Sequence, residues 1–169
     1  MLTQETLRQR LFYNPDTGLF SWRNIPSNKY PGQITGTISY YGYRVIQLDN
    51  TLYRCARLAW LYMTGEWPVE HIDHINGDEA NDSWSNLRAA TRSQNMCNTK
   101  LRADNSSGVR GVSWNKRKGK WHVRVNVRGQ MHHGGYFDDL EEASLVRDMI
   151  ASKLHGDFAR LNILMEKSR

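Results

Sequence analysis

Residues 70–98 read EHIDHINGDEANDSWSNLRAATRSQNMCN, and this stretch decides how the chain is interpreted. It contains an adjacent carboxylate and imidazole, Asp73 and His74. Asn86 follows 12 residues after His74, and Asn95 lies 22 residues after Asp73. Each of these residues alone is usually an ordinary surface or turn residue. The information therefore lies in their combined spacing within one polar stretch.

The same stretch predicts a defined order of secondary structure. The Asn-Gly dipeptide at 76–77 is a strong hairpin signal, and it opens a polar, turn-rich loop. We expect a strand that ends at His74, the loop, a second strand over 87–90, and a helix from Thr91. Thr91 can cap that helix, and Gln94 three residues on can complete a capping box.

This layout closely resembles the ββα-metal motif of HNH nucleases, and it is most similar to the phage and intron-encoded homing endonucleases of that family. The resemblance implies that His74 is the general base that deprotonates the attacking water. It also implies that Asp73 and Asn95 are the two protein ligands of one divalent cation. Asn86 matches the residue that braces the loop and orients the histidine. The third position of the motif is Asn95 rather than histidine, a form that the homing branch also has.

The chemistry of phosphodiester hydrolysis needs these residue types. The attacking water needs a base, for which a neutral imidazole is suited near neutral pH. The negative charge that develops on the leaving oxygen needs a cation, and oxygen ligands suit Mg²⁺, with Mn²⁺ as an alternative. A zinc site made by His71, His74 and Cys97 is a second reading, but these residues lack the paired C-x-x-C spacing of zinc sites.

The charge distribution points to a polyanionic partner. The net charge is +6 and the pI is about 9.5, while the 39% of hydrophobic residues is enough for modest cores. Residues 100–135 contain nine basic side chains and one acidic one, whereas residues 66–82 contain six acidic side chains and no lysine or arginine. We therefore expect double-stranded DNA as the partner, with the basic stretch apart from the metal site.

The two cysteines, Cys55 and Cys97, exclude a disulfide framework and suit a reducing compartment. The chain shows no apolar signal segment at its start, and no apolar run approaches the roughly 18 residues that a membrane span needs. We expect no membrane partner and a cytoplasmic location in an infected or host bacterial cell. The expected oligomeric state is a monomer or a weak dimer.

The first part of the chain predicts a β-rich segment between two helices. Thr3 can cap a helix that runs to about Leu11. Residues 14–18, NPDTG, form a turn in which Pro fixes φ, Asp bonds the backbone and Gly allows positive φ. The other expected elements are strands over 19–22, 33–39 and 43–48 and turns at 41–42 and 49–50. A helix is expected over 54–63, with Ala56, Ala59, Trp60 and Met63 on one face and its end at Gly65.

Aromatic residues are frequent in the first part of the chain, and most of them should pack in the core or in hairpins. A minority are candidates for contact with DNA, which the sequence alone does not separate from the others. The aromatic residues in question are Trp22, Tyr40, Tyr41, Tyr43, Trp60 and Trp67.

The fold class expected for the whole chain is α+β, in two parts. The nuclease domain should span residues 1–100, with the ββα-metal motif at about 69–98. A polar linker should follow at 101–108. A second domain is expected over 109–162, and residues 163–169 form a tail.

The second domain has the pattern of a three-stranded antiparallel sheet packed on one helix. Residues 121–128 alternate between apolar and polar or basic side chains, as in a strand with one buried face. Strands over 110–114 and 131–137 should flank it, and a helix should start at Asp138 or Asp139. The apolar stripe expected to cover the valine face of the sheet is Leu140, Ala143, Val146, Ile150 and Leu154.

This second domain resembles the APETALA2/ethylene-response-factor DNA-binding domain, known in plants and found fused to phage HNH nucleases. The matching landmarks are Arg110-Gly111-Val112, Gly119-Lys120-Trp121, Gly135-Tyr136-Phe137, Glu142-Ala143 and the closing stretch at 156–162. In that family the exposed face of the sheet enters the major groove. The resemblance therefore implies that the polar face of residues 121–128 contacts DNA.

The candidate DNA contacts divide into phosphate anchors and base readers. The basic turn supplies the anchors, Lys116, Arg117, Lys118 and Lys120. Arg110 and Arg124 suit guanine, and Asn126 suits adenine. Ser113 and Asn126 stand where the plant proteins have arginine, so plant sequence preference does not carry over. The full candidate set is Arg110, Ser113, Lys116, Arg117, Lys118, Lys120, Arg124, Asn126, Arg128 and His133.

Two functions from different classes follow from these patterns. The leading one is a metal-dependent, homing-type HNH endonuclease that the second domain holds on duplex DNA. The alternative is a sequence-specific DNA-binding regulator that keeps an inactive nuclease scaffold. The complete set of Asp73, His74, Asn86 and Asn95 favours the enzyme.

Overall fold

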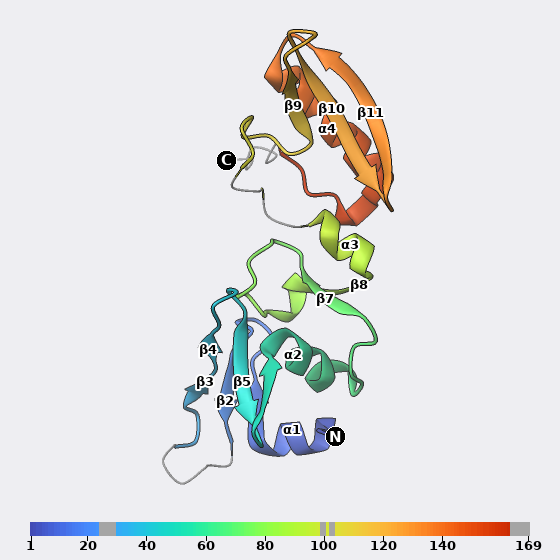
Figure 1. The fold of residues 1–169 in the computed structure, drawn as a ribbon. Helices are drawn as coiled ribbons and strands as arrows, with labels where there is room; N and C mark the ends of the chain where they lie inside the picture. The colour runs from blue at the N-terminus through green and yellow to red at the C-terminus, as the bar shows by residue number, and fades with distance from the viewer. Residues whose placement is uncertain (24–29, 99–100, 102–103, 163–169) are drawn as a thin grey trace. The chain divides into compact units, whose positions relative to one another are not determined.

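The computed structural model describes residues 1–23, 30–98, 101 and 104–162. The chain divides into two compact units, Met1–Thr91 and Arg92–Arg169 (Figure 1). Both contain helices and small antiparallel sheets, so the expected mixed α and β class is confirmed. The division lies earlier in the chain than the expected linker.

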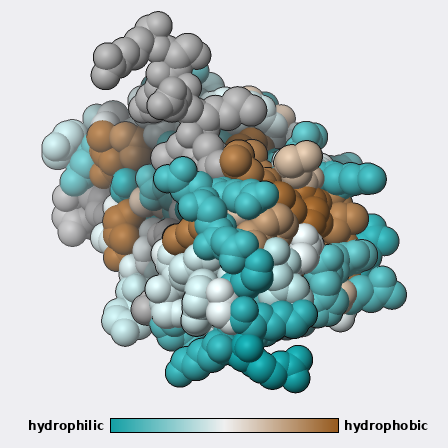
Figure 2. Space-filling view, turned by 90° about the horizontal axis from the view of Figure 1, so that it is seen from above, coloured by the Kyte–Doolittle hydropathy of each residue, from teal (hydrophilic) through white to brown (hydrophobic). Residues whose placement is uncertain are grey.

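Some expectations fall on residues that the structure does not describe. These are the two basic residues Lys100 and Arg102 and the tail at 163–169. In the described part of the chain, no helix has the length and apolar character of a membrane span. Hydrophilic residues dominate the face seen in Figure 2, as expected for a chain with a net charge of +6.

The N-terminal unit consists of short elements. In chain order they are α1 (Gln4–Arg10), β1 (Leu11–Tyr13), β2 (Phe20–Trp22), β3 (Ile34–Thr35), β4 (Thr37–Ile38), β5 (Arg44–Leu48), β6 (Thr51–Arg54), α2 (Cys55–Thr64), β7 (His71–His74), the 3-10 helix η1 (Trp84–Asn86) and β8 (Leu87–Ala90). They form sheets with the strand orders β1-β2-β3, β4-β5-β6 and β7-β8.

The start of this unit follows from local capping and turn chemistry. The Thr3 side chain accepts a hydrogen bond from the backbone N–H of Thr6, so it caps α1 as predicted. The turn at 14–18 is also present, but the expected role of its aspartate is wrong. It is the Asn14 side chain that accepts hydrogen bonds from the next backbone N–H groups, at 2.9 and 3.2 Å. Gly18 has a φ of 73°, which the turn requires.

One strand expected over 33–39 is instead two strands in different sheets. β3 pairs with β2, whereas β4 pairs with β5. The chain breaks between them at Gly36, whose φ of 103° favours glycine. A Cβ there would lie 3.2 Å from side-chain carbons of Arg44 and Ile46, so the turn is also closely packed. The short strands β1 and β6 had no clear sequence signal.

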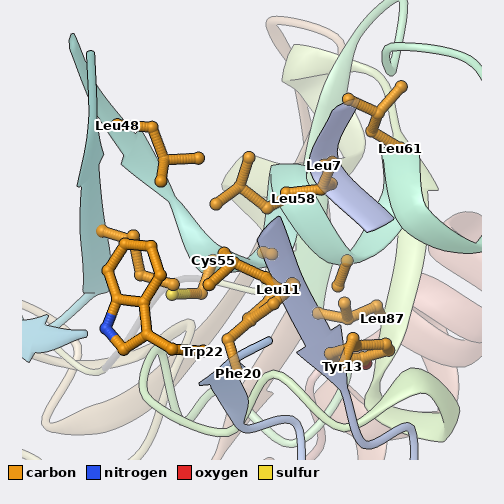
Figure 3. Packing of buried hydrophobic residues seen from close by; sticks show 13 residues of the cluster. Leu7, Leu11, Tyr13, Phe20, Trp22, Leu48, Cys55, Leu58, Leu61 and Leu87 are labelled. Carbon is orange, nitrogen blue, oxygen red and sulfur yellow. The ribbon is translucent and has the colours of Figure 1, made fainter. Parts of the chain in front are cut away.

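α2 begins and ends where its pattern predicts, with Gly65 in the left-handed conformation after it. Its buried face differs from the expectation. Ala56 and Ala59 are buried, but Met63 is exposed. Figure 3 shows the core that these elements build, with Leu7 from α1, Tyr13 and Phe20 from the first sheet, and side chains of α2 and β8. The buried residues of α2 are Cys55, Ala56, Leu58, Ala59 and Leu61.

β7 and β8 form the antiparallel pair that the sequence predicts around the polar loop. Their register joins Asp73 to Arg88 and His74 to Leu87. β7 ends at His74 and β8 covers the expected 87–90. The pair therefore presents the Asp-His dipeptide at the mouth of the loop.

The second unit contains α3 (Arg92–Cys97), β9 (Val112–Asn115), β10 (Lys120–Val127), β11 (Gln130–Phe137), α4 (Leu140–His155) and the 3-10 helix η2 (Gly156–Phe158). The antiparallel sheet has the order β11-β10-β9, with β10 in the middle. α4 lies across one face of this sheet (Figure 1). The predicted strand order and the covering helix are confirmed.

The alternation of β10 gives the sheet its two faces. Val123 and Val125 are buried, while Arg124 and Asn126 are exposed. A bulge interrupts the register of β10 and β11 at Val123 and Arg124. Gly134 lies at this bulge, and a Cβ there would overlap the Val123 side chain. The sheet therefore turns an apolar face to α4 and a polar face to solvent.

α4 starts as predicted, since the Asp139 side chain accepts a hydrogen bond of 2.9 Å from the backbone N–H of Glu142. Its apolar stripe is only partly as expected. Leu140, Ala143 and Ile150 pack in the core with Val123. Val146 and Leu154 are only partly buried, and the buried residues of α4 are Ala143, Ser144, Arg147, Asp148 and Ala151.

α4 carries buried polar residues because they form hydrogen bonds with the segment that follows η2. The Asp148 carboxylate accepts hydrogen bonds from the backbone N–H of Asn162 at 2.6 Å and from its side-chain amide at 3.0 Å. Asn162 accepts from the Arg110 backbone N–H at 2.7 Å and donates to the Arg110 carbonyl at 3.1 Å. This Asn162 clasp joins the segment after η2 to the segment before β9.

Candidate active site and nucleic-acid interface

The catalytic histidine candidate is held inside the N-terminal unit. His74 is the last residue of β7 and is 5% exposed. Its Nε2 lies 2.9 Å from Oδ1 of Asp82, a loop residue that is 1% exposed. The sequence analysis did not single out Asp82. Its only sequence signal was its place among the six acidic residues of 66–82.

Asp73, the metal-ligand candidate next to it, is also buried, at 4% exposure. Adjacent residues of a strand point to opposite faces, so Asp73 and His74 have different neighbours. Oδ2 of Asp73 accepts hydrogen bonds from Nε of Arg88 at 2.8 Å and from its NH2 group at 2.7 Å. Removal of one partner of such a buried pair leaves an uncompensated charge. Arg88 therefore holds the carboxylate in the strand.

Asn86 connects the two sides of the polar loop. Its Oδ1 accepts a hydrogen bond of 3.0 Å from the Asn76 backbone N–H, and its Nδ2 donates one of 2.7 Å to the Asn81 carbonyl. Its own carbonyl accepts from the Ile75 N–H at 2.9 Å. These contacts are those of a loop brace. The contribution of Asn86 to catalysis stays a prediction.

The aromatic residues near His74 divide into packed and exposed ones. Tyr43 lies 6.2 Å from His74 between ring centroids, with the Arg54 guanidinium 4.0 Å from the Tyr43 centroid. Tyr40 and Tyr41, in the turn before it, are 97% and 77% exposed and meet edge to face at 5.4 Å. Of the aromatic residues considered for DNA contact, Tyr40 and Tyr41 are therefore the exposed ones, and their contact with DNA stays a prediction.

Asn95, the second metal-ligand candidate, lies in α3 of the second unit and is half-buried. Its carbonyl accepts a hydrogen bond of 3.2 Å from the Asn98 backbone N–H. Asp73 belongs to the first unit and Asn95 to the second. The assignment of both residues to one cation stays a prediction.

The donor types present fit a hard divalent cation better than zinc. Within the described ranges, no group of three or more His, Cys, Asp or Glu side chains is placed to hold a metal. His71 is exposed and His74 is buried on the same strand, so the two do not act as a pair there. The side chain of Cys97 lies outside the described residues. A buried carboxylate and an amide oxygen are ligands that Mg²⁺ and Mn²⁺ accept, with waters and phosphate oxygens as the others.

The polar face of the second unit carries most of the candidate DNA contacts. Arg124, Asn126 and His133 are exposed on β10 and β11, and the register pairs Arg124 with His133. The basic side chains of the β9–β10 turn, at 116–118, are exposed as well. Some candidates already have partners: Arg124 donates a hydrogen bond of 3.1 Å to Oγ of Ser113. Lys120 forms an ion pair of 2.7 Å with Asp138, and Arg128 has a φ of 50° at the β10–β11 turn.

Two further residues on this face were missed by the sequence analysis. His122 stacks on Tyr136 at 4.4 Å and on His133 at 5.3 Å between ring centroids. The Lys118 ammonium lies 3.7 Å from the Tyr136 centroid. The alternation of residues 121–128 places His122 on the polar face, although His122 was not among the candidate DNA contacts, whereas the position of Tyr136 depends on the bulge at Arg124. This ring stack gives the face flat side chains beside its charged ones.

Four of the candidate residues also line one groove of the second unit. The groove, of about 680 Å³, is bounded by Arg110, Arg124, Asn126 and Arg128, together with Arg147 and His155. Burial and the nearby charges of Arg147 and Arg160 lower the pKa of Arg110, although Asp148 opposes this. Burial and Arg147 also lower the pKa of His155. The groove is lined by the guanidinium groups of Arg110, Arg124, Arg128 and Arg147, and positive charge of this kind favours anions.

Comparison with known proteins agrees with the geometry of the first unit. A family model described as HNH endonuclease matches residues 53–97, from β6 through α3. These residues include the Asp-His pair, the braced loop and Asn95.

Two relatives extend the likeness. The chain is 38% identical over 103 residues to Protein 3.8 of Escherichia phage T7, a match that covers 60% of this chain and 84% of that protein. It is 34% identical over 103 residues to the Uncharacterized HNH endonuclease L560 of Acanthamoeba polyphaga mimivirus, which covers 60% of this chain and 52% of that protein. This chain thus spans about half the length of the mimivirus relative. The chain therefore belongs to one family with Protein 3.8 of phage T7, and its residues 53–97 match the HNH endonuclease family model.

Proposed function

We propose that this protein is a metal-dependent, homing-type HNH endonuclease that hydrolyses phosphodiester bonds of duplex DNA. The observation that carries the proposal is the buried Asp73–His74 pair, in which each side chain has its own charged partner, Arg88 or Asp82, beside a loop braced by Asn86. An ordinary surface turn would leave these side chains exposed. Fixed geometry of this kind is what an active site needs for positioning.

The residues of the first unit have separable tasks in hydrolysis. His74 takes a proton from the water that attacks phosphorus, which makes the water a better nucleophile. Asp73 and Asn95 are the residues that would hold a divalent cation, and Arg88 keeps the Asp73 carboxylate in place. When bound, Mg²⁺ or Mn²⁺ supplies positive charge that stabilises the leaving oxygen. Asn86 keeps the loop closed around the histidine.

DNA would be held by the polar face and basic turn of the second unit, which we propose to act like an APETALA2-type domain. Exposed Lys116, Arg117 and Lys118 suit phosphate contacts, which add affinity without sequence preference. Exposed Arg124 and Asn126 lie on the same strand and suit base edges in the major groove. The stack of His122 and Tyr136 adds flat surfaces that suit sugars and bases.

The test is a plasmid-relaxation assay with purified full-length protein. We expect supercoiled DNA to become nicked in Mg²⁺ or Mn²⁺, and we expect a chelator to stop the reaction. One active site per chain suits a nick, so linear DNA would indicate a dimer. DNA binding without cleavage under every metal condition would contradict the proposal and favour the alternative, a DNA-binding regulator with an inactive nuclease scaffold.

A further inference from the structure

We propose that Asp82 is the positioning residue of His74: it fixes the ring orientation and the tautomer in which this histidine takes up the proton of the attacking water. The inference rests on the proposed nuclease function and extends it to a residue outside the Asp-His-Asn-Asn set. The tautomer of His74 can also be determined in the resting protein, without a measurement of activity.

The contact itself is short and buried. Oδ1 of Asp82 lies 2.9 Å from Nε2 of His74, and the side chains are 1% and 5% exposed. The other carboxylate oxygen, Oδ2, is buried and has no hydrogen-bond partner among the described residues. A carboxylate removed from water is costly unless it is paired. In the described part of the chain the imidazole is therefore the partner that the Asp82 side chain has.

This pairing determines which nitrogen carries the proton. An ionised carboxylate only accepts hydrogen bonds, so Nε2 of His74 must be the N–H donor. A neutral imidazole has one donor and one acceptor nitrogen, so the basic lone pair is then on Nδ1. Asp82 thus holds the ring at Nε2 and assigns proton uptake to Nδ1. The same arrangement, in which one ring nitrogen is fixed by a carboxylate, orients histidines in many metal sites.

Asp82 is in turn held by the first turn of the chain. The Tyr13 hydroxyl donates a hydrogen bond of 2.7 Å to the Asp82 carbonyl. The Trp84 backbone N–H donates one of 2.8 Å to the Pro15 carbonyl. Gly18 lies so close that a Cβ there would overlap the backbone of Asp82 and Ser83. Residues 14–18 therefore support the loop segment that carries the carboxylate.

The Tyr13 phenol and the Cys55 thiol near Asp82 stay uncharged at neutral pH. Burial, and then the charge of Asp82, raise the pKa of Tyr13 and of Cys55 well above their ordinary values. Arg44 acts on Cys55 in the opposite direction, with a smaller effect. The phenol and the thiol therefore add no second negative charge beside the Asp82 carboxylate.

A direct test reads the tautomer of the wild-type protein. In uniformly ¹⁵N-labelled full-length protein at pH 8, long-range ¹H–¹⁵N spectra should show the His74 proton on Nε2. Asp82→Asn should change this pattern, because an amide can donate to Nε2 as well as accept from it. A wild-type His74 with its proton on Nδ1 would overturn the proposal, whatever the activity of the protein.

The kinetic test compares two carboxylates of the same loop. Asp82→Asn should lower kcat for plasmid nicking by about 10–100-fold, the range found when the partner of a functional histidine is removed, and leave KM for DNA unchanged. The matched control is Asp78→Asn, since Asp78 is exposed, lies in the same loop and loses the same charge. The control should retain wild-type kcat. An equal kcat for Asp82→Asn and the control would contradict the proposal.

Two more variants separate positioning from a structural effect. In a His74→Ala background, Asp82→Asn should cause no further loss, because a residue that acts through His74 has nothing left to position. An additional loss there would mean that Asp82 acts in another way. If Asp82→Asn fails to fold, Tyr13→Phe replaces it. Loss of the hydroxyl should loosen Asp82 and lower kcat with KM unchanged, and an unchanged kcat would contradict the proposal. An inactive wild-type protein would instead refute the proposed nuclease function.

Discussion

The two units differ in whether the polar and charged side chains of their candidate sites are buried or exposed. In the first unit Asp73, His74 and Asp82 are buried, and each has a fixed partner. In the second unit Arg124 and Asn126 are exposed on an open face. Chemistry at one phosphorus atom needs side chains in one position, whereas contact with a long, variable polymer tolerates adaptable ones. Changes around His74 in the first unit should therefore affect the rate of cleavage, and changes on the polar face of the second unit should affect DNA affinity.

The largest effect is expected from His74→Ala. Loss of the general base should lower the cleavage rate by about 10²–10⁴-fold, and DNA affinity should stay nearly unchanged because the base acts on water. Plasmid nicking and a gel-shift titration measure the two quantities. His71→Ala is the control, since it removes an exposed histidine from the same strand. A His74→Ala protein that nicks as fast as the control would remove His74 from the mechanism.

A smaller effect is expected at the proposed metal ligands. Asp73→Asn or Asn95→Ala should weaken metal dependence first, and activity should partly return at higher Mg²⁺ or Mn²⁺ because a lost ligand lowers cation affinity. Nicking rates across a metal titration provide the measurement. Thermal unfolding must accompany it for Asp73→Asn, because this change leaves Arg88 without its buried partner. Wild-type cleavage that resists a chelator would defeat the metal assignment.

Variants on the polar face and basic turn of the second unit should change the affinity for DNA and leave the cleavage rate unchanged. Arg124→Ala should cost about 1–3 kcal/mol at particular base pairs and relax sequence preference there. Lys118→Ala should weaken binding to all sequences alike, and it should reduce the salt dependence, in which log K falls by about 0.9 per phosphate neutralised. Binding titrations at several salt concentrations separate the two cases. Similar behaviour of both variants on all sequences would mean that the face only attracts DNA.

The smallest effect is a pH dependence of stability in the second unit. The pKa of His122 is lowered, first by burial and then by Arg124, His133 and Lys118, and that of His155 is lowered as well. Below about pH 6.5, the ordinary pKa of histidine, the unfolded chain then binds more protons than the folded one, so stability falls as pH falls. Urea unfolding at pH 5.5 and 7.5 should show this. A His122→Gln, His155→Gln double variant should show a smaller difference, and an unchanged one would argue against the assignment.

Local patterns predicted the elements that local chemistry controls. The Asn-Gly signal and the short strand pattern after it predicted β7 and β8. The alternation of residues 121–128 predicted the two faces of β10. The capping residues Thr3 and Asp139 predicted where α1 and α4 start. These features depend on hydrogen bonds and periodicity within a few residues. The sequence carries such information without reference to the rest of the fold.

Contacts between distant segments were not predictable in the same way. Asp82 meets His74 because the turn around Gly18, more than 60 residues earlier, sets the path of the loop. The break at Gly36 separates two sheets that a continuous strand pattern would join. Arg147 and Asp148 interrupt the apolar stripe of α4 because Asn162 returns to them. In each case a partner far away in the chain decides the outcome.

The Asn162 clasp has a consequence for the order in which the protein is made. The first unit has all its strands once residue 90 has been synthesised, whereas the second unit is closed only when Asn162 reaches Arg110, 52 residues behind it. Chains emerge from the ribosome N-terminus first, and domains tend to fold as units. The His74 site should therefore form while the second unit, later in the sequence, still lacks its Asn162 contact. A nascent chain would therefore form the buried His74–Asp82 pair before the second unit, which carries Asn95, is complete.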